Sequence, residues 1–307
     1  MSPDMNPLRL RLLLIFAVIA AVLFTSAISA QAPTKRQHAE TAALGADGFF
    51  TTSDGVKLHY RSKGTGRPIV FVPGWTLPGE IWEPQIREFS TRYRTIALDP
   101  RAQGSSEMTG EGLFNGRRGR DVRELLEHLN LSEVVLVGWS MGVREVLTSI
   151  GQSGSARVSA LALVEGDLWV QGDPASRMDL VRRMQADRLA FTKDFVRGMY
   201  AQPQSQEYFD RVTEMSMKTP TSAAATLMVA SAVGPDTDMR QYFGKIDKPV
   251  LYVGVLAKKT QTDVLKAAVP AARIELLPGA GHALFVDQAQ RFNALLEELI
   301  TSSAVKR

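Results

Sequence analysis

The sequence predicts an α/β fold in which a mainly parallel, doubly wound sheet is flanked by helices and carries an inserted helical cap. Three observations lead to this prediction. Short β-branched apolar runs alternate with stretches of helical spacing along most of the chain. One run, residues 133–137, leads directly into Gly138-Trp139-Ser140-Met141-Gly142, and a helix-like stretch follows. Residues 168–243 then form a long stretch without a clear strand.

The first 30 residues have the layout of a secretory signal peptide. Arg9 and Arg11 precede an uninterrupted apolar run, residues 12–24, and small residues follow as far as Ala30. This run is shorter than the ~20 residues of a membrane-spanning helix, so we expect cleavage after Ala30 and no stable membrane span afterwards; the alternative is an uncleaved anchor. The protein has no cysteine, which suits an oxidising compartment. We therefore expect an exported bacterial protein, periplasmic or secreted.

The elements of the mature chain follow in order. A polar stretch, residues 31–46, is predicted to be a flexible lead-in, and a hairpin over residues 49–61 turns at Asp54-Gly55. The predicted strands of the sheet are residues 69–72, 95–98, 134–137, 160–164, 250–253 and 273–276. The predicted helices that cover it are residues 82–90, 116–129, 143–150, 264–268 and 287–301. This assignment gives a core over residues 47–166 and 245–307.

The cap is predicted over residues 167–244. Helices suit residues 179–199, 206–217 and 223–232. Its sequence is rich in methionine, and six of these residues are typical of an adaptable apolar pocket lining, although most of them would equally suit the core of the cap itself; the six are Met178, Met184, Met199, Met215, Met217 and Met228. A segment this long between two strands is expected to be functional.

Ser140 is the predicted nucleophile. It lies between two glycines at a sharp turn from strand to helix, and this turn requires small flanking residues because its backbone is strained. The amides at the start of the helix stabilise negative charge that develops beside the serine.

A serine nucleophile needs a base, and the chain offers four histidines. His38 lies in the lead-in, His59 in the hairpin at an expected surface or edge position, and His128 near a helix end. His282 follows Gly279-Ala280-Gly281 after a predicted strand, on a loop that reaches the carboxyl edge of the sheet. His282 is therefore the predicted base.

These motifs resemble the α/β-hydrolase superfamily, in its serine-nucleophile, esterase-like branch. The resemblance covers roughly residues 48–300 and includes three further segments, residues 69–75, 95–105 and 276–282. Pro73-Gly74 stands where many members have His-Gly, and Ala102 replaces a glycine. The resemblance implies an oxyanion hole formed by the amides of Trp75 and Met141.

The acid departs from the common pattern of that family. It usually follows the strand here predicted at residues 250–253, but this chain has Lys258 and Lys259 there, and no carboxylate until Asp263. Some members carry the acid after the preceding strand, where this chain has Glu165 and Asp167. We favour Glu165, at the strand tip, with Asp167 as the alternative, and expect Asp263 to be an acid at a helix start.

Other features have structural interpretations. Asp99 is expected to cap a turn and to hydrogen-bond Arg101, and Trp139 and Trp169 to line an apolar pocket or pack in the core. No metal ion or cofactor is predicted, because the histidines are isolated, cysteine is absent and no phosphate-binding loop occurs. The net charge of +4 is spread along the chain and does not favour nucleic acid.

The resemblance thus implies an exported serine hydrolase that cleaves esters of small to medium apolar acyl groups, in preference to charged or polymeric substrates, through an acyl-enzyme. Hydrolysis of a carbon–carbon bond uses similar residues. Cofactor-free ring-cleaving dioxygenases of this fold also resemble the chain, in the loop 72–75 and in Glu165 with Trp169. A non-catalytic ligand-binding scaffold is a third alternative. The oligomeric state stays open.

Overall fold

The computed structural model describes residues 45–170 and 173–304. The predicted signal peptide, nearly all of the lead-in and His38 lie outside the described residues. No helix within the described residues is long and apolar enough to cross a membrane.

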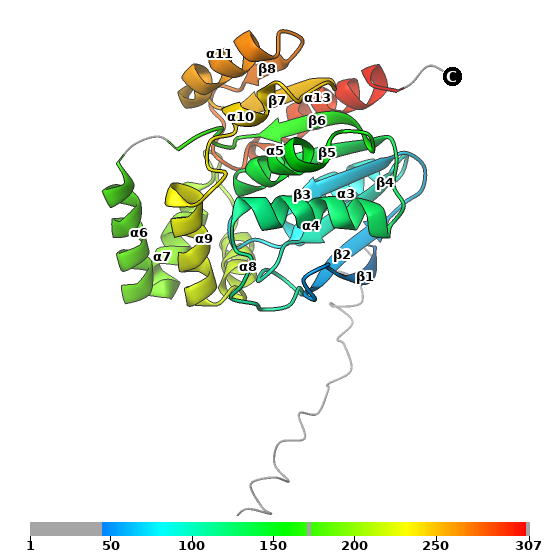
Figure 1. Cartoon of the computed structure of the whole chain (residues 1–307). Helices are drawn as coiled ribbons and strands as arrows, with labels where there is room; N and C mark the ends of the chain where they lie inside the picture. The colour runs from blue at the N-terminus through cyan, green and yellow to red at the C-terminus, as the bar shows by residue number, and fades with distance from the viewer. Residues whose placement is uncertain (1–44, 171–172, 305–307) are drawn as a thin grey trace, which may run out of the picture. The chain divides into compact units, whose positions relative to one another are not determined.

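The described chain forms an eight-stranded sheet in the order β1-β2-β4-β3-β5-β6-β7-β8 (Figure 1). The first two strands form an antiparallel hairpin whose second strand also pairs antiparallel with β4, while the six strands from β4 to β8 run parallel. The strands are β1 (Ala46–Thr51), β2 (Lys57–Lys63), β3 (Pro68–Val72), β4 (Arg94–Asp99), β5 (Val134–Trp139), β6 (Val158–Val164), β7 (Val250–Gly254) and β8 (Arg273–Leu276). The predicted fold class is confirmed.

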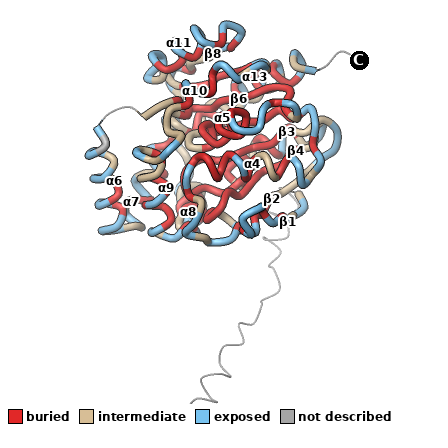
Figure 2. The backbone as a smooth tube through the Cα atoms, in the orientation of Figure 1, coloured by how far each residue is buried: buried red, intermediate tan, exposed pale blue. Residues whose placement is uncertain are grey.

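Helices cover both faces of the sheet because each central strand is apolar on both sides. In β3, Ile69 and Phe71 pack into one core and Val70 and Val72 into the other, and Figure 2 shows these strands as buried. The helices on the first face are α3 (Glu83–Phe89) and α13 (Ala289–Ser302). The short helices that precede them, η1 (Gly79–Trp82) and α12 (Leu284–Asp287), pack on the same face. The helices on the second face are α4 (Asn115–His128), α5 (Met141–Ser153), α10 (Arg240–Phe243) and α11 (Lys259–Ala268), which η2 (Leu256–Lys258) precedes.

The described residues between β6 and α10 form four helices. They are α6 (Pro174–Ala186), α7 (Arg188–Gly198), α8 (Gln206–Met217) and α9 (Thr221–Val233). The helix expected over residues 179–199 is two helices, because the carboxylate of Asp187 accepts the amide hydrogen of Ala190 and so begins α7. An apolar cluster joins α6, α7 and α9 to Trp75, Ala102 and Leu113 of the core.

His59 is not at the surface or at a sheet edge, as the sequence suggested. β2 pairs with β1 along one edge and with β4 along the other, so β2 is an interior strand. His59 is accordingly only 2% exposed. Its Nδ1 lies 2.8 Å from a carboxylate oxygen of Asp99, and its Nε2 lies 2.9 Å from one of Asp47. The imidazole therefore connects β1 with β4.

Asp99 holds the turn after β4, as expected, but does not bind Arg101. Its carboxylate accepts hydrogen bonds from the amides of Gly79 and Ser105. Arg101 turns the other way and forms an ion pair with the buried Asp121. The predicted pairing failed because His59 approaches Asp99 from the neighbouring strand.

Candidate active site

Ser140 lies at the tight turn between β5 and α5. Its φ angle of 56° is in the left-handed region, which is strained for a residue with a side chain. Both flanking glycines are required by space: a Cβ on Gly142 would lie 2.5 Å from the carbonyl oxygen of Val72, and one on Gly138 would lie 2.5 Å from the carbonyl oxygen of Gly142. The turn therefore projects the serine hydroxyl away from the backbone at the carboxyl edge of the sheet.

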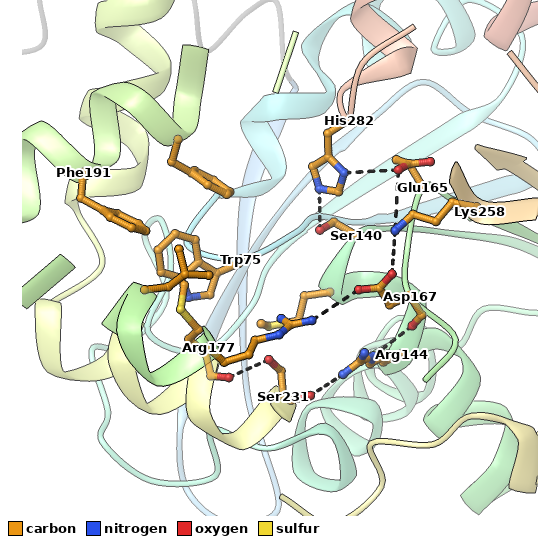
Figure 3. Close-up of a pocket in the computed structure, with 14 residues that line it drawn as sticks. Trp75, Ser140, Arg144, Glu165, Asp167, Arg177, Phe191, Ser231, Lys258 and His282 are labelled. Atoms are coloured by element: carbon orange, nitrogen blue, oxygen red, sulfur yellow. Dashed lines mark hydrogen bonds and ion pairs between the residues drawn. The ribbon is translucent and has the colours of Figure 1, made fainter. Parts of the chain in front are cut away.

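His282 reaches this hydroxyl from the loop after β8. Its Nε2 lies 2.8 Å from the Oγ of Ser140 (Figure 3). The indole N–H of Trp139 donates to the carbonyl oxygen of His282, and the carboxylate of Asp287 accepts the amide hydrogen of Gly281. These bonds fix the loop on both sides of the imidazole.

Glu165 approaches the other nitrogen of the imidazole. It follows β6 directly, is 4% exposed, and has one carboxylate oxygen 3.7 Å from the Nδ1 of His282. The second oxygen accepts the amide hydrogen of Val255, at 2.8 Å. Serine, imidazole and carboxylate thus form a continuous row along the ends of β5, β8 and β6.

Asp167, the alternative acid, has no contact with His282 among the described residues. Its carboxylate lies 2.6 Å from the ammonium of Lys258 and 3.6 Å from the guanidinium of Arg177. Burial raises the pKa of Asp167, but Lys258 and the nearby arginines outweigh this effect and keep the pKa below its ordinary value. Asp263 lies within α11, exposed, and pairs with Lys259.

The two residues expected to supply the oxyanion hole, Trp75 and Met141, line the cavity together with Ser140. Met141 begins α5, and its amide has no partner within that helix. Trp75 follows Gly74, whose Cα is so close to the serine that a Cβ there would lie 2.9 Å from that of Ser140. Neither the Trp75 amide nor the Met141 amide donates a hydrogen bond to another described residue.

A cavity of about 250 Å³ opens over Ser140. One side is apolar and is formed by Trp75 of the β3 loop together with residues of the helical segment: Leu180, Phe191, Phe195 and Met228. The rings of Phe191 and Phe195 meet the indole of Trp75 edge to face. The opposite side is charged and holds Arg144, Glu165, Asp167, Arg177 and Lys258 (Figure 3).

Comparisons with known proteins identify the family. The pattern of the alpha/beta hydrolase family matches residues 69–295. The chain belongs to this family.

Relatives of this α/β hydrolase carry two kinds of name. A non-heme chloroperoxidase from Kitasatospora aureofaciens is 28% identical, over 81% of this chain and 98% of that protein. A non-heme haloperoxidase from Rhodococcus erythropolis is 29% identical, over 83% and 99%. The crystal structure of a bromoperoxidase from Bacillus anthracis has a TM-score of 0.77 at 26% identity, over 83% and 100%. An esterase from Exiguobacterium antarcticum shares the fold, with a TM-score of 0.76 at 23% identity, over 82% and 98%.

The pocket of this α/β hydrolase differs from the methionine-rich lining expected from its sequence. Of the six methionines named above for the cap, only Met228 lines the cavity; Met184, Met199 and Met215 are buried in apolar clusters. Trp139 is buried under the histidine loop, and Trp169 packs beside the second core, so neither lines the cavity. The aromatic rings of Trp75, Phe191 and Phe195 line the apolar side of the cavity instead.

Sequence reasoning missed two residues of the site. Lys258 was noticed only as an obstacle to an acid, but its ammonium lies between Asp167 and Glu165. The sequence analysis did not predict a role for Arg144, which lies in the first turn of α5, four residues after Ser140. That spacing was the one signal available.

The described residues contain no group of three or more His, Asp or Glu side chains that could hold a metal ion.

Proposed function

We propose that this enzyme is an exported serine hydrolase that cleaves esters of small to medium acyl groups through an acyl-enzyme. One observation carries the proposal: the hydroxyl of Ser140, at a strained turn, lies 2.8 Å from the Nε2 of His282. This is the distance at which a histidine accepts the proton of an attacking serine.

The chemistry follows from the positions of the groups. His282 takes the proton as the Oγ of Ser140 attacks the ester carbonyl, and Glu165 stabilises the resulting imidazolium. The amides of Trp75 and Met141 hold the negatively charged oxygen. His282 then returns its proton to the departing alcohol, and a water molecule, activated by the same imidazole, cleaves the acyl-enzyme.

The cavity supports a small substrate. Its volume of about 250 Å³ is below the range of about 300–1,000 Å³ that is typical of sites for drug-sized ligands. The aromatic wall of Trp75, Phe191 and Phe195 would receive the hydrocarbon part of the substrate. A polymer or a long-chain triglyceride would not fit without rearrangement of the helices above.

The test is a panel of p-nitrophenyl esters of increasing acyl length, measured with the wild type and with Ser140→Ala. We expect turnover of short and medium esters, and its loss in the variant, because alanine fits the turn but supplies no nucleophile. A fluorophosphonate probe should label the wild type only. Retention of more than about a tenth of wild-type turnover in Ser140→Ala would contradict the proposal. An absence of labelling in the wild type would favour a ligand-binding scaffold.

A second reaction is favoured by the haloperoxidase names of two relatives that match over nearly their whole length. Hydrogen peroxide in place of water would attack the acyl-enzyme, release a peracid and regenerate Ser140. Peracid formation in acetate buffer with peroxide measures it. Equal formation by Ser140→Ala would exclude this route.

Export is also proposed, on the N-terminal sequence alone. Mass spectrometry of the protein from its native host should find a mature N-terminus at or near Gln31. An intact segment 1–30 in the membrane fraction would instead indicate an anchor.

A further inference from the structure

Arg144 is a buried cation at the floor of the cavity. It lies in the first turn of α5, four residues after Ser140, and is only 4% exposed. Its guanidinium lines the same cavity as Ser140 and His282 (Figure 3). Arg144 and the nucleophile Ser140 therefore belong to the lining of one small space.

No carboxylate neutralises this guanidinium. Its Nε–H donates to the carbonyl oxygen of Asp167 at 3.0 Å, and its Nη1 donates to the carbonyl oxygen of Ser231 at 2.5 Å. Nη2 has no hydrogen-bond partner, and no acidic side chain lies within 4 Å, among the described residues. Burial lowers the pKa of Arg144 to about 10, so it stays charged near neutral pH.

The neighbouring acids are already engaged. Asp167 is paired with Lys258 and Arg177, and Glu165 lies between His282 and Lys258. Three cations and two carboxylates therefore line this side of the cavity, which leaves one positive charge in excess. A buried charge without an ionic partner is costly, and here Arg144 belongs to the lining of the space that a substrate would fill.

We propose that Arg144 binds a carboxylate group of the substrate, so that the natural substrate is an ester that also carries a free carboxylate a few carbon atoms from the reacting carbonyl. This inference rests on the proposed function. The carboxylate accepts hydrogen bonds from the free edge of the guanidinium, the ester carbonyl lies at Ser140, and the alcohol lies against Trp75 and Phe195. The expected preference for apolar over charged acyl groups is thereby reversed for carboxylates of the right length.

The test compares two esters that differ only in charge: the p-nitrophenyl half-ester of adipic acid and its counterpart with a terminal amide. We expect the wild type to have a kcat/KM about ten- to a hundredfold higher for the acid, the scale of one buried charge-assisted hydrogen bond. Most of the difference should lie in KM. Arg144→Gln should bring the ratio close to one, and Arg144→Lys should retain part of it.

Arg182→Gln is the matched control, because Arg182 is an exposed arginine of α6 that pairs with Asp179. It should leave the ratio between the two esters unchanged. Thermal unfolding of each variant checks that the loss of two hydrogen bonds to backbone carbonyls has not unfolded Arg144→Gln. If Arg144→Gln is unfolded, carboxylate binding by Arg144 is tested instead with Arg144→Lys and by competitive inhibition of the wild type by adipate.

Binding of adipate to Ser140→Ala, measured by calorimetry, separates this inference from the proposed function. Binding that Arg144→Gln abolishes supports the carboxylate site even if neither ester is hydrolysed, in which case only the proposed function fails. Hydrolysis of the amide ester as fast as the acid by the wild type, or no binding of adipate, overturns the inference and leaves ester hydrolysis standing.

Discussion

Glu165 reaches His282 from a strained position. Its φ angle of 46° lies in the left-handed region, and its amide donates to the carbonyl oxygen of Val253 in the adjacent strand. That conformation turns the carboxylate across the end of β6 and toward β7. The amide of Glu165 and one of its carboxylate oxygens are thus both hydrogen-bonded to the backbone at the end of β7. A carboxylate fixed in this way is well suited to orient an imidazole.

The acid can be assigned by three amide substitutions. We expect Glu165→Gln to lower kcat by about a thousandfold or more, on the scale of similar replacements, because the imidazolium loses its partner. Asp167→Asn should cause a smaller loss, through Lys258, and Asp263→Asn almost none. Turnover with one p-nitrophenyl ester at fixed pH measures all three. A crippled Asp263→Asn would show that the acid follows β7.

Single residues of the site could be predicted where a local sequence pattern marked them. Ser140 stands in a five-residue turn pattern, and His282 was the histidine left after three others were set aside. The position of Lys258 and the contact between Asp99 and His59 depend instead on which strands become neighbours. No local pattern carries that information, so the surroundings of the site could not be read in advance.

Helices α4 and α5 are joined by a buried ion pair. The guanidinium of Arg118 lies 2.7 Å from a carboxylate oxygen of Glu145, and both side chains are almost fully buried. Arg118 also donates to the side chain of Gln103, whose amide in turn donates to the carbonyl oxygen of Gly74. The pair therefore supports the loop that carries the Trp75 amide.

Breaking this pair should be costly. Arg118→Met leaves Glu145 buried without its cation, so we expect a loss of about 3–5 kcal/mol in the free energy of unfolding. Urea denaturation monitored by circular dichroism measures it. The double variant Arg118→Met/Glu145→Leu is the control and should recover much of the loss. A double variant as unstable as the single one would show that packing, rather than the charge, was lost.

The alternation of the elements could be predicted better than their bounds. The alternation of strands and helices predicted a parallel sheet with helices on both faces, and both are confirmed. The single helix expected over residues 179–199 failed at Asp187, because a side-chain cap ends one helix and begins the next. Amphipathic spacing alone does not show such a break.

The stability of the whole molecule should depend on the protonation of His59. Burial lowers the pKa of its imidazole, but the carboxylates of Asp99 and Asp47 outweigh this effect and raise the pKa above its ordinary value of 6.5. A raised pKa in the folded state means that the protonated form stabilises the fold. This contribution is complete below pH 6.5 and is lost as the pH rises through the raised value.

We therefore expect the free energy of unfolding of the wild type to exceed that of His59→Gln most at mildly acid pH. The gap should narrow as the pH rises through and beyond neutrality. Denaturant titrations of both proteins from pH 5.5 to 9 measure the difference directly. A gap that widened with pH would mean that His59 is held neutral.

The end of β6 has a wider consequence. β6 and β7 are hydrogen-bonded neighbours that align Val164 with Val253, so both strands deliver their next residues to the same place. The bond from the Val255 amide to Glu165 marks where they meet. An acidic side chain can therefore come from either strand without any displacement of the histidine. A motif search that looks for the acid only after β7 passes over this chain, whereas a search for the spatial arrangement of side chains around His282 finds it.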